Sequence, residues 1–571
     1  MGNRSHDEDA SRARPVNRKR FGIGCLGLLI LLDSGRALAA PCIDLIDTSS
    51  PVLANGFASD LANTRDNPSQ ITSANVADLQ LALVHIAAGS KEKRGAPAVT
   101  EQAVFFSAGR DLVAMNRKSG CIYWTYTVPY KITLFVGSNA VRSSAIYYLD
   151  EGPPRPALVL AGDFYGNYYA LDAKTGAPVW SRFVGTDKTH HFITGAPQFY
   201  GGRLIVPVSS KEVLSAVVEP LRACCQSHGL VLALDPYSGT MLWRYDTTPD
   251  ASYNAAVRHD APNGASVWGT PAIDLARNAV YIGTGQNLTP PTTIDSDSII
   301  ALDLDSGLPK WVFQATVGDA FNAGCSLPFP IDTTCVPPVG PDFDFGAPPI
   351  LAHPAGGDAV IAGSKNGVVY SLNPDTGALN WSRRLGAGGT LGGIHWGMAA
   401  DGGKVYVAVS DVTVNKASGL QLGIQSQVEP VPDARPGIYA LDLATGALVW
   451  EAHPQHLVDG QPYASIYSAA LSVTNDVLFA GSLDGTVKAF RTSDGAELWS
   501  YDTAQSYADA DGNSGNGGTI DSVGAIPAGT DLLVNSGYDT FGSANEYQAG
   551  PGNALLIFRL PSANAHPAAA K

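Results

Sequence analysis

The sequence predicts an all-β fold, an eight-bladed β-propeller with tryptophan-docking repeats, and three observations lead to this prediction. Seven of the nine tryptophans end a short unit of similar sequence. A β-branched, apolar run precedes each unit, so that a repeat holds about four strands. Glycine and proline, with 61 and 38 copies, suit a chain rich in turns and poor in helices.

Each repeat unit starts with a small residue and ends ten positions later in tryptophan. In most copies Asp or Asn, followed by Ser or Thr and Gly, predicts a tight turn, because glycine readily adopts a positive φ. The large indole ring is then able to pack against a neighbouring copy. The copies are AMNRKSGCIYW from Ala114, ALDAKTGAPVW from Ala170, ALDPYSGTMLW from Ala233, ALDLDSGLPKW from Ala301, SLNPDTGALNW from Ser371, ALDLATGALVW from Ala440 and AFRTSDGAELW from Ala489.

The two ends of the chain supply the eighth sheet. Residues 552–560 read GNALLIFRL, and an apolar stretch lies near Leu79 to Ile86. Sheets repeated around a ring leave only short edges, and a sheet shared by both termini would lock the ring.

The first forty residues read as a signal peptide. Basic residues between Arg12 and Arg20 precede an apolar run from Phe21 to Leu32, and Ala37 to Ala39 offers small residues for cleavage. An amino-terminal membrane anchor is the alternative. We therefore expect a signal peptide over 1–40, a single propeller domain over 41–562, a disordered tail over 563–571, and a periplasmic or secreted protein.

Composition limits the partners. The mature chain has no second long apolar segment, so no membrane span is expected. The net charge of -15 disfavours binding to the phosphates of nucleic acid.

Residues 506–518, rich in Gly, Asn, Asp and Ser, suggest a flexible loop.

Six cysteines remain after removal of the signal peptide, an even number that permits disulfides in an exported chain. Cys325 and Cys335 suit a loop staple. Cys224 and Cys225 form either a vicinal disulfide or two thiols. No Cys-x-x-Cys-His motif for covalent haem occurs in the sequence.

Several short motifs follow one another in a specific order. They are NTR from Asn63, VWG from Val267, GTGQN from Gly283, GDA from Gly318, GSKNG from Gly363 and GGIHWGM from Gly392. In this order and spacing the chain resembles the pyrroloquinoline-quinone-dependent dehydrogenases, most closely the polyvinyl alcohol dehydrogenase branch. The resemblance covers nearly the whole mature chain.

The resemblance implies an enzyme that oxidises secondary alcohol groups to ketones, with a substrate that is either small or polymeric. It implies two cofactors, pyrroloquinoline quinone and calcium. Without a haem motif, the electrons would pass to an external cytochrome c.

The resemblance also implies site residues. A flat polyanionic quinone needs a stacking surface, cations and a Lewis acid. The expected cofactor-binding residues are Arg142, Thr194, Trp268, Lys365, His395 and Trp396. The expected metal ligands are Glu212 and either Gln286 or Asn287. For each residue a purely structural role, such as core packing or turn formation, is the alternative.

The residue at the expected position of the general base differs from that of the family. The methanol and ethanol enzymes carry a second aspartate three residues after a first one, and here that position is Asn322, while Asp319 remains. Asp319 is the candidate catalytic base, and another acid or a lack of activity is the alternative. Cys224 and Cys225 lie away from the position of the adjacent cysteines in those enzymes, so no cofactor contact is carried over to them.

Two other functions compete with this one. The same tryptophan repeats would serve in a noncatalytic scaffold of the cell envelope. A quinoprotein that acts on a sugar is the third hypothesis.

Overall fold

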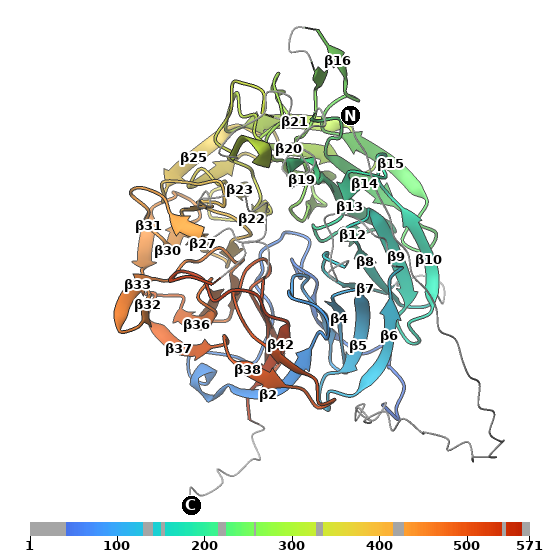
Figure 1. The fold of residues 1–571 in the computed structure, drawn as a ribbon, viewed down its shortest axis with the longest axis vertical. Helices are drawn as coiled ribbons and strands as arrows, with labels where there is room; N and C mark the ends of the chain where they lie inside the picture. Colours follow the sequence, from blue (N-terminus) through green and yellow to red (C-terminus); the bar gives the residue numbers. More distant parts are fainter. Residues whose placement is uncertain are drawn as a thin grey trace, which may run out of the picture. The chain divides into compact units, whose positions relative to one another are not determined.

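Eight antiparallel sheets follow one another around a ring in the computed structural model, as Figure 1 shows. The structure describes residues 42–129, 141–149, 155–214, 224–255, 259–326, 335–414, 428–538 and 544–561. The expected signal peptide and tail lie outside these residues. Among the described residues, no helix has the length and apolar character needed to cross a bilayer.

The first four sheets are contiguous in sequence. Sheet 1 contains β1 (Val52–Asn55), β3 (Ala98–Thr100), β4 (Ala103–Ala108), β5 (Asp111–Asn116) and β6 (Ile122–Thr127). Sheet 2 contains β7 (Ile146–Tyr148), β8 (Leu158–Gly162), β9 (Asn167–Asp172) and β10 (Pro178–Phe183). Sheet 3 contains β12 (Gln198–Tyr200), β13 (Arg203–Ser210), β14 (Leu230–Leu234) and β15 (Met241–Asp246), with β11 (His191–Phe192) beside β13. Sheet 4 contains β18 (Ala272–Asp274), β19 (Ala279–Gly283), β20 (Ser298–Asp303) and β21 (Pro309–Gln314).

The other four sheets complete the ring. Sheet 5 contains β22 (Ile350–Ala352), β23 (Ala359–Gly363), β24 (Val368–Leu372) and β25 (Leu379–Arg384). Sheet 6 contains β26 (Ala399–Ala400), β27 (Lys404–Val409), β30 (Gly437–Asp442) and β31 (Leu448–Ala452). Sheet 7 contains β34 (Ser472–Thr474), β35 (Val477–Gly481), β36 (Thr486–Arg491) and β37 (Glu497–Asp502). Sheet 8 contains β40 (Ala525–Ala528), β41 (Asp531–Ser536), β42 (Ala554–Arg559) and β2 (Gln80–Ile86).

Short hairpins decorate the connecting loops. They are β16 (Ser252–Asn254) with β17 (His259–Ala261), β28 (Val412–Val414) with β29 (Val428–Pro430), β32 (Gln455–Val458) with β33 (Gln461–Ala464), and β38 (Ser506–Ala508) with β39 (Ser514–Asn516). Two 3₁₀ helices, η1 (Val76–Asp78) and η2 (Ala323–Ser326), complete the elements of the described chain.

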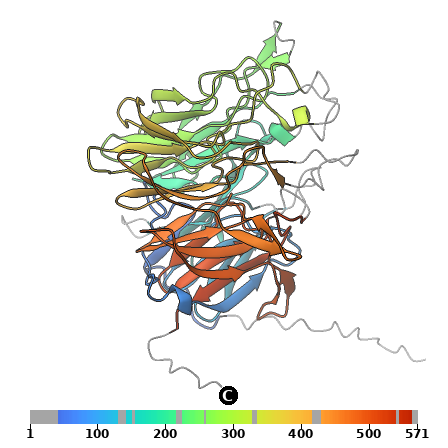
Figure 2. The ribbon, with the colours of Figure 1, turned by 90° about the vertical axis from the view of Figure 1, so that its left-hand side faces the viewer.

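The eighth sheet confirms the predicted closure. β2 pairs with β42 in antiparallel register, from Gln80 opposite Arg559 to Ile86 opposite Ala554. Figures 1 and 2 both show the blue β2 beside the red strands of the other end of the chain. The main-chain hydrogen bonds between the two ends fasten the ring without a covalent link.

The tryptophans join each sheet to the next. Trp243 donates from Nε1 to the Leu304 carbonyl, 3.0 Å away, and its ring lies against Gly307, the turn glycine of the next repeat. The same pairing of an indole with the following turn glycine recurs for Trp124 with Gly176, Trp180 with Gly239, Trp311 with Gly377, Trp381 with Gly446 and Trp450 with Gly495. Trp499 instead packs on Phe558, 5.4 Å between ring centroids, because sheet 8 carries no copy of the repeat. The small first residue of each unit lies directly opposite the tryptophan, as Ala233 does opposite Trp243.

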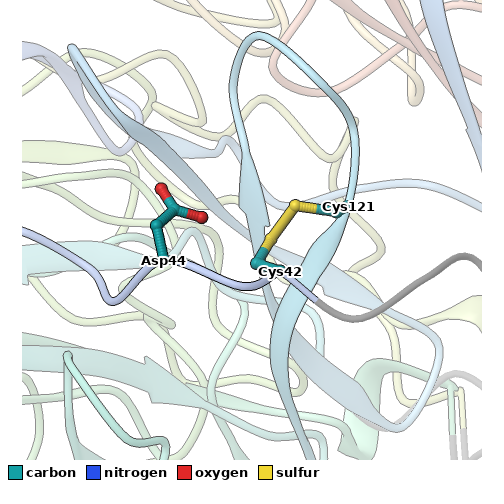
Figure 3. A group of neighbouring side chains, drawn as sticks. All are labelled: Cys42, Asp44 and Cys121. Atoms are coloured by element: carbon teal, nitrogen blue, oxygen red, sulfur yellow. A yellow bond between two sulfur atoms is a disulfide. The ribbon is translucent and has the colours of Figure 1, made fainter.

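Three disulfides staple the loops of the described chain. Cys325 pairs with Cys335 as predicted, Cys224 pairs with Cys225, and Cys42 pairs with Cys121. Figure 3 shows Asp44 beside the Cys42–Cys121 pair. Among the described residues, this is the one group of three side chains of the types that bind metals whose ligand atoms lie close together. Because both sulfurs are bonded to each other, and Asp44 accepts hydrogen bonds from Gln102 and Tyr123, this cluster ties the start of the chain to sheet 1.

Residues 506–518, expected to form a flexible loop, contain a paired hairpin. β38 and β39 form a hairpin there, with Ser506 opposite Asn516. Asp509 stabilises its turn, because the carboxylate accepts hydrogen bonds from the backbone and side-chain amides of Asn513. The small polar residues serve turn chemistry here.

The topology brings one set of connecting loops to the same face of the ring. The first strands of neighbouring sheets contact one another, as β18 does with β22 and β22 with β26, so they line the axis. Because neighbouring strands are antiparallel, the loop entering each first strand and the loop joining the second strand to the third emerge at the same edge. We call this edge the upper face.

Candidate functional site on the upper face

All the predicted site residues lie on loops of the upper face. Glu212 follows β13, Gln286 and Asn287 follow β19, and Lys365 follows β23. Arg142 precedes β7, Thr194 precedes β12, Trp268 precedes β18, Asp319 lies between β21 and β22, and His395 and Trp396 precede β26. The fold therefore carries residues distant in sequence to one face around the axis.

Trp268 is the centre of an aromatic cluster. Its side chain is half-buried, and its ring centroid lies 5.2 Å from that of Trp396 and 5.7 Å from that of His395, both edge-on. The Lys365 Nζ lies 5.8 Å from the Trp268 centroid. Gly346 supports the indole, because a Cβ at this position would overlap the Trp268 ring. An aromatic plane flanked by a cation suits a flat, electron-accepting ligand.

Lys365 is buried between two carboxylates that sequence reasoning did not select. Its Nζ lies 2.9 Å from Asp344 Oδ2 and 3.3 Å from Asp342 Oδ2. Burial by itself lowers the pKa of Lys365, but attraction to Asp342 and Asp344 outweighs it and raises the pKa above its ordinary value. The ammonium group therefore stays charged inside the site.

Several buried aspartates lie near this lysine. Burial raises the pKa of Asp342 well above its ordinary value, and the charges of Asp344 and Asp319 act in the same direction against Lys365. Burial also raises the pKa of Asp297, a fully buried residue whose two carboxylate oxygens accept no hydrogen bond in the described chain. Protons are thus held more tightly here than on ordinary aspartates.

Glu212 is buried and uses its two oxygens differently. Oε2 accepts hydrogen bonds from the Gln226 amide, the Ser227 amide and the Ser227 hydroxyl, at 2.8, 2.6 and 2.5 Å. Oε1 accepts no hydrogen bond within the described residues and lies 3.8 Å from His190 Nδ1. The first oxygen fixes the side chain, and the second is not used in holding it.

The geometry separates Gln286 from Asn287. The Asn287 side-chain oxygen accepts from the Thr293 amide, and its nitrogen donates to the Asn263 carbonyl, so it is engaged in loop structure. Gln286 donates to the Phe321 carbonyl, but its side-chain oxygen has no hydrogen-bond donor in the part of the chain described. Gly264 and Ser227 connect Gln286 to Glu212. Gly264 lies against the Gln286 backbone and donates from its amide to the Ser227 carbonyl, and the Ser227 amide donates to Glu212.

Asp319 is fully buried, and its oxygens accept the backbone amides of Asp342 and Phe343, at 3.1 and 2.8 Å. Burial raises the pKa of Asp319, against the lowering effect of these two amides. Asn322, also buried, donates to the Leu288 carbonyl. In this structure Asp319 fastens the loop that carries Asp342.

Arg142 and Thr194 lie on the loops that enter sheets 2 and 3. The Arg142 guanidinium lies 3.3 Å from Glu92 Oε1 and stacks over Phe164, 4.1 Å from its centroid. Lys211, the neighbour of Glu212, faces the same ring at 5.4 Å. Thr194 is half-buried and precedes Gly195, which packs against the Trp268 carbonyl.

His395 and Trp396 form one wall beside Trp268. His395 Nδ1 lies 2.8 Å from Ser468 Oγ. Burial and the neighbouring Lys365 charge lower the pKa of His395 well below its ordinary value, so the imidazole is neutral. Trp396 contacts His395 at 5.0 Å and Tyr538 at 6.2 Å between ring centroids.

Cys224 and Cys225 follow Glu212 in the sequence and are buried with Leu288. The two residues that follow, Gln226 and Ser227, supply the amides on Glu212 Oε2. The pair therefore belongs to the support of the glutamate loop.

Sequence reasoning missed Asp342, Asp344 and Asp521 as candidate site residues. Asp342 and Asp344 stand in PDFDF from Pro341, displaced from the Asp319 motif by the insertion that the Cys325–Cys335 disulfide closes. Two aspartates on alternate positions next to an apolar strand were the available signal. Asp521 lies beside Trp396 and Ser468, and nothing local marks it.

The residues present fit both groups that the family resemblance implies. The half-exposed Trp268 ring, the charged Lys365 and the neutral His395 suit a stacked quinone. The uncommitted oxygens of Glu212 and Gln286 suit a hard cation, which prefers carboxylate and carbonyl oxygens.

Comparison with known proteins places the chain as a whole. A family model described as the glucose/ethanol/alcohol dehydrogenase β-propeller domain matches residues 57–328, and a model for the outer membrane protein assembly factor BamB matches residues 295–520. A polyvinylalcohol dehydrogenase from a Pseudomonas species is 33% identical over 532 residues, which is 90% of this chain and 78% of the relative. The polyvinylalcohol dehydrogenase of Sphingopyxis sp. (strain 113P3) is 31% identical over 93% of this chain and 79% of its own length.

A solved structure shows the same fold. The quinohemoprotein alcohol dehydrogenase from Comamonas testosteroni superposes with a TM-score of 0.64 at 20% identity, covering 91% of this chain and 82% of that one. The extent and identity of the sequence matches decide the assignment: the chain belongs to the pyrroloquinoline-quinone-dependent dehydrogenase family, in the branch of the polyvinyl alcohol dehydrogenases.

Proposed function

We propose that the protein is an exported alcohol dehydrogenase that binds pyrroloquinoline quinone and calcium, oxidises secondary alcohol groups to ketones, and passes the electrons to an external cytochrome c. The names of the relatives support an alcohol carried on a polymer as substrate. The signal-peptide pattern over residues 1–40 supports export, and the lack of a haem motif in the sequence supports a separate acceptor.

One observation carries the proposal. Lys365 lies over Trp268 at 5.8 Å and is held there by Asp342 and Asp344. A buried ammonium paired with two carboxylates beside a half-exposed indole is costly to fold and has no evident packing benefit. A cation in this place stabilises negative charge on a reduced ligand stacked on Trp268.

The residues divide the work as follows. Trp268 supplies the stacking surface, while Arg142, Thr194 and Trp396 line the rest of the cofactor site. Glu212 Oε1 and the Gln286 side-chain oxygen would hold the calcium ion. The bound quinone would supply the two-electron oxidising power, with the metal as the Lewis acid beside it.

The hydroxyl proton of the alcohol needs an acceptor. Both oxygens of Asp319 already accept backbone amides, so we assign Asp319 to holding the loop and place the proton acceptor at Asp344. Asp344 Oδ1 accepts from the Gln286 amide at 3.1 Å, and Oδ2 faces Lys365. Asp344 thus adjoins a proposed metal ligand and the proposed quinone contact at once.

The test reconstitutes the purified chain with the quinone and calcium and follows dye reduction with secondary alcohols, poly(vinyl alcohol) and sugars. We expect turnover with secondary alcohols. Asp344→Asn should lower kcat by at least about a hundredfold, the scale of general-base catalysis. An unchanged kcat in Asp344→Asn together with a lost one in Asp319→Asn would return the role of base to Asp319.

Glu212 is tested through calcium. Glu212→Gln should abolish activation by calcium, and Glu497→Gln, an exposed carboxylate on the outer strand β37, should leave it unchanged. Calcium activation that persists in Glu212→Gln would remove this residue from the metal site.

The match to an assembly-factor model over residues 295–520 favours a noncatalytic scaffold as second candidate. A scaffold has no need of a buried Lys365 with two carboxylates. Failure of the reconstituted wild type to bind quinone would favour the scaffold, and turnover with sugars alone would favour a sugar dehydrogenase.

A further inference from the structure

Two arginines lie side by side on the upper face, in the loops that enter sheets 1 and 2. Arg94 precedes β3, and Arg142 precedes β7. Glu92 joins them, because its Oε2 lies 2.9 Å from Arg94 Nε and its Oε1 lies 3.3 Å from Arg142 Nη2. The Arg94 and Glu92 side chains are 7% and 4% exposed, so these charges are held inside the protein. One buried carboxylate is therefore shared by two guanidinium groups.

The backbone around Arg94 is fixed by its neighbours. The carbonyl of the next residue, Gly95, accepts a hydrogen bond from Asn535 Nδ2 at 2.8 Å. Gly95 also packs against the Ser143 carbonyl, which a Cβ at this position would overlap. Asn535 lies on β41 of sheet 8, and Ser143 follows Arg142 in the loop that enters sheet 2. Residues of sheet 8 and of the sheet 2 loop thus hold the Arg94 loop in place.

The Arg94 guanidinium has a donor that nothing in the described chain accepts. Nε donates to Glu92, while Nη2 is buried and has no hydrogen-bond acceptor among the described residues. The next carboxylate, Asp521, attracts Arg94 without forming an ion pair with it in the part of the chain described. A buried, charged donor without an acceptor is destabilising, and such groups are rare in folded proteins. An anionic ligand is therefore the natural complement of Nη2.

Aromatic contacts connect Arg94 to the proposed stacking surface. The guanidinium carbon lies 4.4 Å from the centroid of the Tyr538 ring. Tyr538 contacts Trp396 at 6.2 Å, and Trp396 contacts Trp268 at 5.2 Å, between ring centroids. Arg94 thus belongs to the same continuous group of side chains as Trp268.

The order of the sheets sets Arg94 across the axis from Lys365. Arg94 precedes β3 of sheet 1, and Lys365 follows β23 of sheet 5, which is four steps away in a ring of eight sheets. Figure 1 shows β4 of sheet 1 and β23 of sheet 5 on opposite sides of the ring. A flat ligand on the axis would therefore have a cation on each of two opposite sides. This arrangement suits a ligand whose acidic groups lie away from its reactive end.

We propose that Arg94 binds a carboxylate of pyrroloquinoline quinone, on the side of the cofactor away from Lys365, and that Glu92 positions the guanidinium for this contact. The inference rests on the proposed function, which supplies the cofactor. Arginine presents its N–H groups in a rigid, planar fork that matches the oxygens of a carboxylate. Glu92 engages Nε, so Nη2 is left for the ligand.

The test measures binding to the full cofactor-free chain, so it does not depend on catalysis. Quenching of tryptophan fluorescence follows the binding of pyrroloquinoline quinone and of its methyl ester, in which the carboxylates are neutral. Arg94→Gln should weaken binding of the quinone about ten- to a hundredfold, through the loss of a charge-assisted hydrogen bond, and should leave binding of the ester unchanged.

A second variant separates the charge of Arg94 from its geometry. Arg94→Lys keeps the charge and lacks Nη2. It should bind the quinone more weakly than the wild type and more tightly than Arg94→Gln. It also carries the test if Arg94→Gln does not fold.

Arg117 offers a matched control. It is also buried, at 4% exposure, and pairs with Glu101 and Asp531. It lies in the turn between β5 and β6, on the face opposite the site. Arg117→Gln should leave the binding of both compounds unchanged.

The outcomes distinguish this proposal from the proposed function. Wild-type affinity for the quinone in the Arg94 variants, or an equal loss for quinone and ester, would overturn the role of Arg94, because a merely structural role affects both compounds alike. Quinone binding that depends on Arg94 but supports no turnover of alcohols would refute the proposed catalysis and leave the Arg94 contact standing. A wild type that binds no quinone would overturn both.

Discussion

Adding one methyl group at Gly307 tests the docking of tryptophan between sheets. A Cβ on Gly307 would lie 2.5 Å from Trp243 Cε3 and 2.8 Å from Cδ2, closer than any relaxed contact. The residue also has a φ of +71°, which costs alanine about 1–2 kcal/mol. Overpacking against the ring adds about 1–3 kcal/mol. Gly307→Ala should therefore lower the free energy of unfolding by about 2–5 kcal/mol.

Gly202 provides the matched control. Its φ of +74° imposes the same backbone cost, but a Cβ there would meet nothing within 4 Å. Gly202→Ala should cost only about 1–2 kcal/mol. Urea unfolding followed by far-UV circular dichroism and tryptophan fluorescence measures both variants. Equal losses in the two variants would refute the idea that the indole and the turn glycine lock neighbouring sheets together.

Three further changes probe other parts of the molecule. The Cys42–Cys121 bridge spans 79 residues, so its removal by a Cys42→Ser/Cys121→Ser double substitution should lower stability by about 4 kcal/mol, measured by urea unfolding under oxidising conditions. Burial raises the pKa of Asp521 from 3.8 to about 6. The free energy of unfolding of the protein should therefore fall by about 3 kcal/mol as the pH rises through that interval. Asp521→Asn should remove this component from the pH profile of stability. Identical profiles would contradict the buried carboxylate. Asp319→Asn should lower the free energy of unfolding by about 1–3 kcal/mol, because an amide NH₂ would then face the Asp342 or Phe343 backbone N–H. An unchanged melting temperature would count against the role of Asp319 in holding that loop.

The sequence by itself determined the fold and the family. The repeat from Ala114 to Trp499 is local, and its turn, its small residue and its tryptophan each have a physical role that is readable within eleven positions. The two apolar strands at the ends were sufficient to predict the closing sheet, because an unpaired strand needs a partner. The family resemblance also made Trp268, Glu212 and Lys365 candidates, and the structure places them on one face.

Only the tertiary structure decided how these residues work together. It separated Gln286 from Asn287, because the oxygen of one is engaged in its own loop and that of the other is not. It brought Asp342 and Asp344 to Lys365 and joined His395 to Ser468 across 73 residues. Such pairings depend on which loops a closed ring brings side by side, and a ring closes through contacts between sheets far apart in sequence. No local pattern encodes them, because the burial that shifts these pKa values exists only after the sheets have packed.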